Sequence, residues 1–228
     1  MLEILPDPFL KEIAAQPAAI RRAASALHDQ LPALRRVPAV SNGRNLVFTG
    51  MGGSYDACYA PVTTLAAAGI PGVMVDSAEL LYFRRPMLAA RTLLVVVSQS
   101  GESAEVVRLI KELNRSEQRP FVVSVTNGLE NTLARFANVA LDTRAGLERG
   151  PSTITFAGAL VVLGALAHVL SGKFADEVVL DVDANAEAAA DAVDRFIAMA
   201  QDLSNNLRSW LGDRPILTIL ARGAARCG

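Results

Sequence analysis

The stretch Leu93-Leu94-Val95-Val96-Val97, followed at once by Ser98-Gln99-Ser100-Gly101-Glu102-Ser103, decides the fold. Five consecutive apolar residues, three of them β-branched, are typical of a strand that is buried on both faces of a parallel sheet. The polar loop that follows contains three serines and leads into a helical pattern over residues 104–114. A strand that ends in a polar loop and continues into a helix is the repeating unit of an open α/β sheet.

Other short apolar runs repeat this design: Leu46–Thr49, Val73–Asp76, Phe121–Val125 and the weaker Val139–Leu141. Helical stretches such as 57–68 and 131–136 lie between them. We therefore predict an open parallel sheet with helices on both sides. Because ligands bind beyond the carboxyl ends of such strands, the functional residues should lie in the loops after Phe48, Val97 and Val125.

Helical patterns flank the sheet pattern on both sides. Asp7-Pro8 is a helix start, and Pro17 interrupts the apolar spacing that follows, so we expect a kink or two short helices. Residues 156–170 are apolar apart from one histidine and predict a buried helix, because 15 residues are too few to span a bilayer. Residues 183–211 predict a long amphipathic helix.

These patterns divide the chain into parts. An N-terminal helical segment covers residues 1–42, the sheet domain covers 43–172, and a linker with the long helix covers 173–212. Residues 213–228 contain the apolar run Ile216–Leu220 and then a glycine-bearing turn, as the sheet domain does at its start. We expect them to begin a second, similar domain.

The composition excludes several classes of partner. The 228 residues include 22 Lys+Arg and 23 Asp+Glu, so the net charge of −1 gives no long-range attraction to nucleic acid or to an anionic membrane. Cys58 and Cys227 are far apart and indicate neither a disulfide framework nor a zinc site. No basic, apolar leader precedes the first helix, so we expect a cytoplasmic protein.

The loop after the first strand, Thr49-Gly50-Met51-Gly52-Gly53-Ser54-Tyr55, is rich in glycine. Glycines let the backbone approach a ligand closely, and the next helix start offers N–H groups to an anion. A dinucleotide fingerprint would need glycine where Tyr55 stands, although Asp76 could bind a ribose. An NAD-dependent oxidoreductase is therefore a weaker alternative, and a tight turn without a ligand is another.

The serine loop, residues 98–103, offers more polar groups than a helix cap needs. One hydroxyl caps a helix, so simple capping by Ser98 or Ser100 would leave the other serines and Gln99 without a role. Hydroxyls together with helix N–H groups form an uncharged cradle for a phosphate. We predict phosphate binding at this loop.

Together, Gly-Met-Gly-Gly-Ser at 50–54 and Ser-Gln-Ser-Gly-Glu-Ser at 98–103 resemble the sugar isomerase (SIS) domain family. More narrowly, the sequence is similar to the isomerase half of glutamine–fructose-6-phosphate aminotransferase and to stand-alone phosphosugar isomerases and deaminases. The stretches 11–20, 76–79 and 145–153 fit the same family, so the resemblance spans nearly the whole chain. It implies a flavodoxin-like three-layer sandwich.

The resemblance also implies a substrate site for a sugar phosphate. The phosphate would be held by the serine loop, through Ser98, Gln99, Ser100 and Ser103. Gly53 and Ser54 would face the sugar hydroxyls, and the backbone near Gly150 and Ser152 would close over the sugar. The family uses no metal and no organic cofactor, and its members commonly form homodimers.

The chain departs from the family pattern at three places. Ile154 follows the Ser-Thr pair of the 145–153 loop, where the family commonly has lysine. No glutaminase domain precedes the sheet domain, so we expect no use of glutamine-derived ammonia. The acid–base residues of the family belong to a second SIS domain and the carboxyl tail, which leaves Glu148 as a weak catalytic candidate better suited to loop closure.

We therefore expect a protein that binds a phosphorylated sugar or aminosugar. It would be part of an aldose–ketose phosphosugar isomerase or an aminosugar-6-phosphate deaminase. A non-catalytic sugar-phosphate sensor that uses the same pocket is the alternative function.

Overall fold

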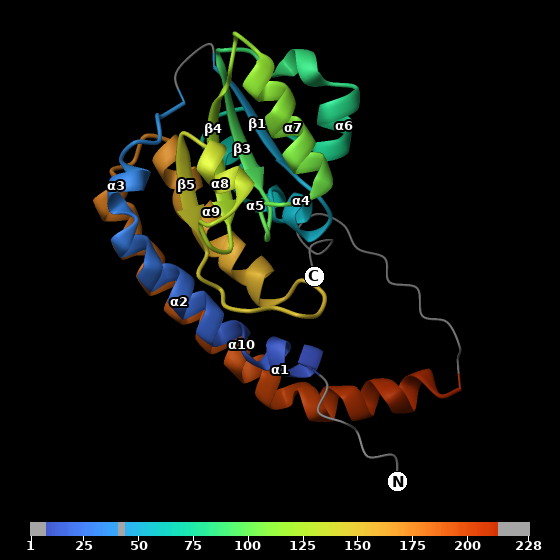
Figure 1. Ribbon diagram of the computed structural model, residues 1–228. Helices are drawn as coiled ribbons and strands as arrows, with labels where there is room; N and C mark the ends of the chain where they lie inside the picture. The colour runs from blue at the N-terminus through green and yellow to red at the C-terminus, as the bar shows by residue number, and fades with distance from the viewer. Residues whose placement is uncertain (1–7, 41–43, 214–228) are drawn as a thin grey trace.

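Five parallel strands form a single sheet in the computed structural model, which describes residues 8–40 and 44–213 (Figure 1). The strands are β1 (Asn45–Gly50), β2 (Val73–Asp76), β3 (Thr92–Val97), β4 (Phe121–Thr126) and β5 (Val139–Asp142). Their order is β2-β1-β3-β4-β5, and every neighbouring pair is parallel. The five strands predicted between residues 46 and 141 and the predicted parallel sheet are thus confirmed.

Helices cover both faces of the sheet. They are α1 (Pro8–Ala14), α2 (Gln16–Asp29), α3 (Leu31–Leu34), α4 (Gly53–Ala57), α5 (Tyr59–Ala67), α6 (Ser77–Tyr82), the 3-10 helix η1 (Arg85–Met87), α7 (Ala104–Arg115), α8 (Thr132–Phe136), α9 (Ile154–Leu170) and α10 (Ala175–Leu211). The predicted break near Pro17 is confirmed, because α1 ends at Ala14 and Pro17 lies in the first turn of α2.

Two helix boundaries differ from the sequence prediction. The stretch 57–68, predicted as one helix, belongs to two helices that meet at Cys58. The long helix begins at Ala175, eight residues before the predicted start at 183. The helix start predicted at Asp7 and the strand predicted at 216–220 lie outside the described residues.

The central strands are buried because alternate side chains enter two separate cores. Phe48, Val95 and Val97 pack on the side of α9, in a cluster that also includes Leu27 of α2. Leu94 and its neighbours on the opposite face pack against α6 and α7. All six residues of β3 are buried. This three-layer packing explains why the strands read as unbroken apolar runs.

The α2 and α10 helices lie side by side on the outside of the α9 layer (Figure 1). Arg21 of α2 forms ion pairs with Glu187, Asp191 and Asp194 of α10. With 37 residues, α10 is about 56 Å long and extends past α2. No described helix is both long enough and apolar enough to cross a membrane.

An apolar stripe lies on the carboxyl half of α10. It consists of Phe196, Met199, Leu203, Leu207 and Trp210, each between 41% and 66% exposed. These residues are three or four positions apart, so they share one side of the helix. We call them the α10 stripe.

Gly50 is the position where the sheet tolerates no side chain. A Cβ there would lie 2.7 Å from the Ser54 carbonyl carbon and 2.8 Å from the Tyr55 backbone nitrogen, because α4 turns back over the end of β1. We expect Gly50→Ala to lower the free energy of unfolding by about 2 kcal/mol, the cost of overpacking a rigid backbone contact. Urea denaturation measures this change.

Gly164 of α9 provides the matched control. A Cβ at this position meets no atom within 4 Å, and the residue is helical. We expect Gly164→Ala to raise the free energy of unfolding by about 0.5–1 kcal/mol, the difference in helix propensity between the two residues. Equal effects of the two substitutions would contradict the close packing of β1 against α4.

Candidate functional site

A hollow lies at the carboxyl edge of the sheet, where β1, β3 and β4 end. Its polar wall is made of Gly53, Ser54, Gln99, Thr126, Asn127, Thr143, Ser152 and Thr155. The structure thus brings four of the predicted site residues to one place, namely Gly53, Ser54, Gln99 and Ser152. The hollow is narrow: its cavity volume is about 10 Å³, which is enough for about one water molecule.

The serine loop borders this hollow and organises its own backbone. Ser98 is 3% exposed, and its Oγ accepts a hydrogen bond from the Gly101 N–H at 3.2 Å and lies 3.2 Å from Ser103 Oγ. Ser100 Oγ accepts from the Glu102 N–H at 3.2 Å. These hydroxyls therefore shape the loop itself, and no side chain caps the first turn of α7.

The uncapped start of α7 matters because the first N–H groups of a helix have no acceptor within the helix. Here the helix begins directly after a loop that carries the Ser98, Ser100 and Ser103 hydroxyls, at the edge of the sheet where β3 ends. Such a terminus carries a partial positive charge that favours an anion. Neither Ser98 nor Ser100 caps α7, so simple helix capping does not explain these two serines.

The outer side of the serine loop is fixed to α8. Glu102 accepts hydrogen bonds from the Thr132 N–H at 2.5 Å and from the Thr132 hydroxyl at 2.8 Å. These bonds, with the backbone bond contributing most, lower the pKa of Glu102 below its usual value. Gly101 has a φ of +65°, and a Cβ there would lie 2.0 Å from Asn131 Oδ1, so this position requires glycine.

The 145–153 loop is held over the hollow by Glu148. Its Oε1 accepts from the Thr153 N–H at 2.7 Å, the Thr153 hydroxyl at 3.0 Å and the Thr155 N–H at 3.2 Å, and its Oε2 accepts from the Thr155 hydroxyl. The carboxylate thereby caps the start of α9, where the helix dipole favours a negative charge. Both oxygens are engaged in structure, which suits loop closure better than proton transfer.

A second carboxylate holds the same loop from another part of the chain. Glu12 of α1 is only 8% exposed, and it accepts hydrogen bonds from the backbone N–H groups of Arg149 at 2.6 Å and Gly150 at 3.1 Å. A Cβ on Gly150 would lie 2.9 Å from Glu12 Oε2. Gly150 therefore contacts α1, and no local sequence pattern indicates this role for Glu12.

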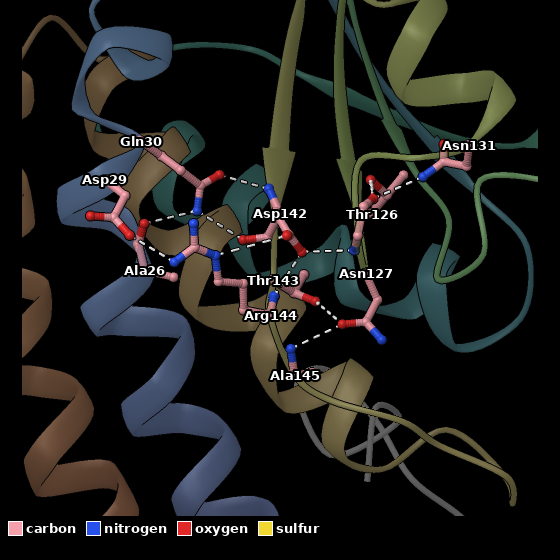
Figure 2. Close-up of polar contacts among 11 residues, drawn as sticks. Ala26, Asp29, Gln30, Thr126, Asn127, Asn131, Asp142, Thr143, Arg144 and Ala145 are labelled. Carbon is pink, nitrogen blue, oxygen red and sulfur yellow. Dashed lines mark hydrogen bonds and ion pairs between the residues drawn. The ribbon is translucent and has the colours of Figure 1, made fainter.

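Asn127 lies in the loop directly after β4 and also lines the hollow (Figure 2). Its Oδ1 accepts from the Thr143 hydroxyl at 3.1 Å and the Ala145 N–H at 2.9 Å, while its Nδ2 donates to the Gly146 carbonyl at 2.7 Å. We expected function after Val125 without singling out this residue. The signal for it is the polar triplet Thr-Asn-Gly at the end of an apolar strand.

Asp142, at the end of β5, holds the loops that contain Asn127 and Thr143 (Figure 2). Its Oδ1 accepts from the N–H groups of Gly128 at 2.7 Å and Arg144 at 2.9 Å. Its backbone pairs with the side chain of Gln30, just after α2, which donates to the Asp142 carbonyl at 2.9 Å and accepts from the Asp142 N–H at 2.7 Å. The first helical segment therefore fixes the loops of the sheet edge.

Neither histidine lies at the hollow. His28 Nε2 is 2.5 Å from Asp183 on α10, and His168 lies on α9, where desolvation lowers its pKa. The described residues contain no group of three histidine, cysteine, aspartate or glutamate side chains that could hold a metal ion. Asp76 Oδ1 accepts from the Ala78 N–H at 2.8 Å and caps α6, which accounts for this residue without a nucleotide.

Comparison with known proteins agrees with this fold. Residues 39–169 match the model of the SIS domain family. The chain belongs to this family.

Relatives of this SIS protein include enzymes that act on sugar phosphates. The glutamine–fructose-6-phosphate aminotransferase (isomerizing) of Pyrococcus horikoshii is 30% identical over 217 residues, which cover 94% of this chain and 35% of that protein. The arabinose 5-phosphate isomerase KpsF of Escherichia coli is 27% identical over 154 residues, 65% of this chain and 46% of that protein. The SIS chain therefore spans about a third of the length of the aminotransferase it matches.

The fold agrees with solved structures of the family. The C-terminal domain of glucosamine–fructose-6-phosphate aminotransferase from Francisella tularensis superposes with a TM-score of 0.76 at 19% identity. The match covers 98% of the SIS chain and 64% of that chain. At this level of identity the likeness concerns the fold.

We expect Glu12→Ala to loosen the 145–153 loop of this SIS domain, because the backbone N–H groups of Arg149 and Gly150 lose a partly buried acceptor. The free energy of unfolding should fall by about 1–3 kcal/mol, and amide hydrogen exchange at Arg149 and Gly150 should accelerate. Lys11→Ala changes an exposed residue of the same helix and should leave both quantities unchanged. Unaltered exchange in the Glu12 variant would show that α1 does not hold the loop.

Cys58 should be chemically inert in the folded SIS domain. The residue is fully buried, and burial, with a smaller contribution from Asp56, raises the pKa of its thiol to about 12. The thiolate that reacts with alkylating agents is therefore almost absent at neutral pH. Peptide mapping after iodoacetamide treatment should find Cys58 unmodified without denaturant and modified in urea. Rapid native modification would contradict this.

Proposed function

We propose that this SIS domain binds the phosphate group of a phosphorylated sugar or aminosugar at the serine loop. The observation that carries the proposal is the uncapped first turn of α7, which stands beside the Ser98, Ser100 and Ser103 hydroxyls at the carboxyl edge of the sheet. A cradle of N–H and hydroxyl groups attracts a phosphate without a positive side chain, so the ligand is held but also released. The relatives' names point to the same substrate class.

Gly53, Ser54, Gln99 and Ser152 would contact the sugar, since they line the adjoining hollow. The hollow has room for about one water molecule, so a sugar needs additional space. The 145–153 loop is the element that would move, because Ser152 Cβ lies only 3.4 Å from a Cβ built on Gly53. In this proposal Glu12 and Glu148 hold the loop in its closed position, and Gly150 and Ser152 close over the sugar.

We further propose that the chain is one part of an aldose–ketose phosphosugar isomerase or an aminosugar-6-phosphate deaminase. Proton transfer between sugar carbons needs a positioned acid or base. Near the hollow, the carboxylates of Glu12 and Glu148 already accept backbone hydrogen bonds. The acid–base group would therefore come from the second SIS domain, of which residues 213–228 are proposed to be only the beginning.

The proposed division of the chain rests on the helices that flank the sheet. Residues 1–42 and 173–212 supply the paired helices α2 and α10, and residues 213–228 would begin a second SIS domain. The α10 stripe supports this division, because its exposed side chains offer an apolar surface close to that point in the chain. The resemblance to SIS enzymes also makes a homodimer our expected assembly, which sedimentation measurements test.

The decisive measurement is a thermal-shift series with fructose 6-phosphate, glucosamine 6-phosphate, inorganic phosphate and NAD. A ligand at about 100 times its dissociation constant stabilises a protein by about 2.7 kcal/mol, which corresponds to several degrees for a chain of this size. We expect both sugar phosphates to raise the melting temperature and NAD to leave it unchanged. A shift with NAD alone would contradict the proposal.

Ser100→Ala should abolish the shift, because it removes a hydroxyl from the cradle. Ser116→Ala is the matched control: Ser116 Oγ accepts from the Gln118 N–H at 3.2 Å, the same turn that Ser100 makes with Glu102, but away from the hollow. The control variant should retain the full shift. Isomerisation by the purified 228-residue chain would contradict the proposed external acid–base group, whereas binding without turnover is the expected result.

A further inference from the structure

A second hollow lies between α6, η1 and α7, away from the carboxyl-edge site. Its volume is about 450 Å³, and it is lined by Leu81, Tyr82, Arg85, Arg108, Lys111, Glu112 and Arg115. It shares no lining residue with the hollow at the serine loop. A volume between about 300 and 1,000 Å³ is usual for a small-molecule site. We call it the basic groove.

The charge of the basic groove is unbalanced. Four of its side chains are basic and one is acidic, although the whole chain has a net charge of −1. Among the described residues, Lys111 forms no ion pair, and Arg108 donates only to the neutral Tyr82 hydroxyl, at 2.8 Å. Neither Arg108 nor Lys111 is therefore ion-paired with a carboxylate of the described residues.

Its arginines are nevertheless held in position. Glu112 accepts from Arg85 Nη1 at 2.7 Å and from Arg115 Nη1 at 2.8 Å, so one carboxylate fixes two guanidinium groups from two elements. The Tyr82 hydroxyl fixes Arg108 in the same way. Arginine groups that are already oriented lose less entropy when they bind a phosphate or carboxylate, and their planar N–H pairs match both anions.

The spacing on α7 carries a cost that an anion would relieve. Arg108, Lys111 and Arg115 lie three and four positions apart, so they form one row on the outer side of the helix. Like charges at these spacings destabilise a helix. The opposite side of α7 is buried through residues such as Leu109, so the packing of the helix keeps this row of cations at the surface.

A smaller hollow of about 360 Å³ continues from the basic groove and shares Arg85 and Glu112 with it. It is lined mainly by apolar side chains, including Pro86, Leu88 and Leu113. The two hollows together offer a cationic compartment and an apolar compartment in contact. This combination suits a ligand with a charged end and an uncharged end.

We propose that the basic groove binds a small ligand that carries two or more phosphate or carboxylate groups. The charged groups lie against Arg108 and Lys111, and the uncharged part of the ligand lies toward Leu88. A long polyanion such as nucleic acid is not the occupant, because the chain as a whole is slightly acidic and the cations are gathered around one hollow. This site is independent of the function proposed for the serine loop.

Titration calorimetry with tripolyphosphate, citrate and adenosine diphosphate tests the proposal at low ionic strength. At least one of these probes should bind the full chain saturably, with a dissociation constant below about 1 mM. Tighter binding of tripolyphosphate than of citrate would assign the site to phosphates, and the reverse would assign it to carboxylates. Tighter binding of adenosine diphosphate would place a flat group in the apolar compartment. Absence of saturable binding by all three would overturn the proposal.

Two variants locate the binding. The double variant Arg108→Gln, Lys111→Gln removes the unpaired cations from exposed positions and should weaken binding at least tenfold. The matched control Lys173→Gln, Arg195→Gln removes the same charge from exposed positions elsewhere and should change affinity less than twofold. Equal losses in the two variants would show a non-specific charge effect and overturn the site.

Two further variants test whether the anion lies in the basic groove itself. Ser100→Ala removes a contact of the phosphate site proposed at the serine loop, so the tripolyphosphate binding that remains in this variant belongs to the groove and should still fall at least tenfold when Arg108→Gln and Lys111→Gln are added. Disappearance of all binding with Ser100→Ala alone would place the anion at the serine loop and contradict the proposal. Glu112→Gln removes the one negative charge of the groove, while the amide oxygen of glutamine can still accept a hydrogen bond from arginine, so binding should strengthen several-fold. Weaker binding to this variant would contradict the placement of the anion among these side chains.

Discussion

The pairing of β1 with β3 is the constraint on which the rest of the structure depends. The chain forms β2 on one side of β1 and then crosses to place β3 on the other side, so the winding reverses between these two strands. Loops after neighbouring strands diverge at such a point and leave a crevice beyond their carboxyl ends. The glycine loop after β1 and the serine loop after β3 meet there. All six residues of β3 are buried, so the core holds the end of the strand from which the serine loop starts.

Carboxylates at this edge act mainly as acceptors for backbone N–H groups. Glu12 and Glu148 hold the 145–153 loop, Asp142 holds the turns beside Asn127, and Glu102 holds the start of α8. Each bond fixes a loop that would otherwise have unsatisfied donors. These carboxylates are therefore occupied by backbone donors, and the proposed attraction of the edge for an anion comes from a helix terminus and hydroxyls.

Much of the fold could be predicted from the sequence, because strands that are buried on both faces of the sheet must consist of consecutive apolar residues. Runs such as Leu93–Val97 and Phe121–Val125 are apolar throughout, and the polar loops behind them mark the strand ends. The candidate site could be predicted as far as the hydroxyls and glycines that follow those strands. Which of them face the hollow depended on the tertiary structure.

The contributions from distant parts of the chain could not be predicted. Glu12 contacts Arg149 across 137 residues, and Gln30 contacts Asp142 across 112 residues, so no local pattern marks either side chain. The division of 57–68 into α4 and α5 was also missed, because alanine-rich sequence is helical on either side of Cys58. The basic groove likewise needs the α6–α7 packing that brings Arg85 to Glu112.

The pairing of α2 with α10 has a consequence for how the chain folds during synthesis. Arg21 finds its partners 166 to 173 residues later, so the outer helix layer is completed by the last described part of the chain. At a ribosomal rate of about 5–20 residues per second, α2 waits on the order of ten seconds for its partner. During that time the apolar side of α2 is incompletely covered. Nascent chains of this protein therefore expose part of this apolar side until α10 leaves the ribosome.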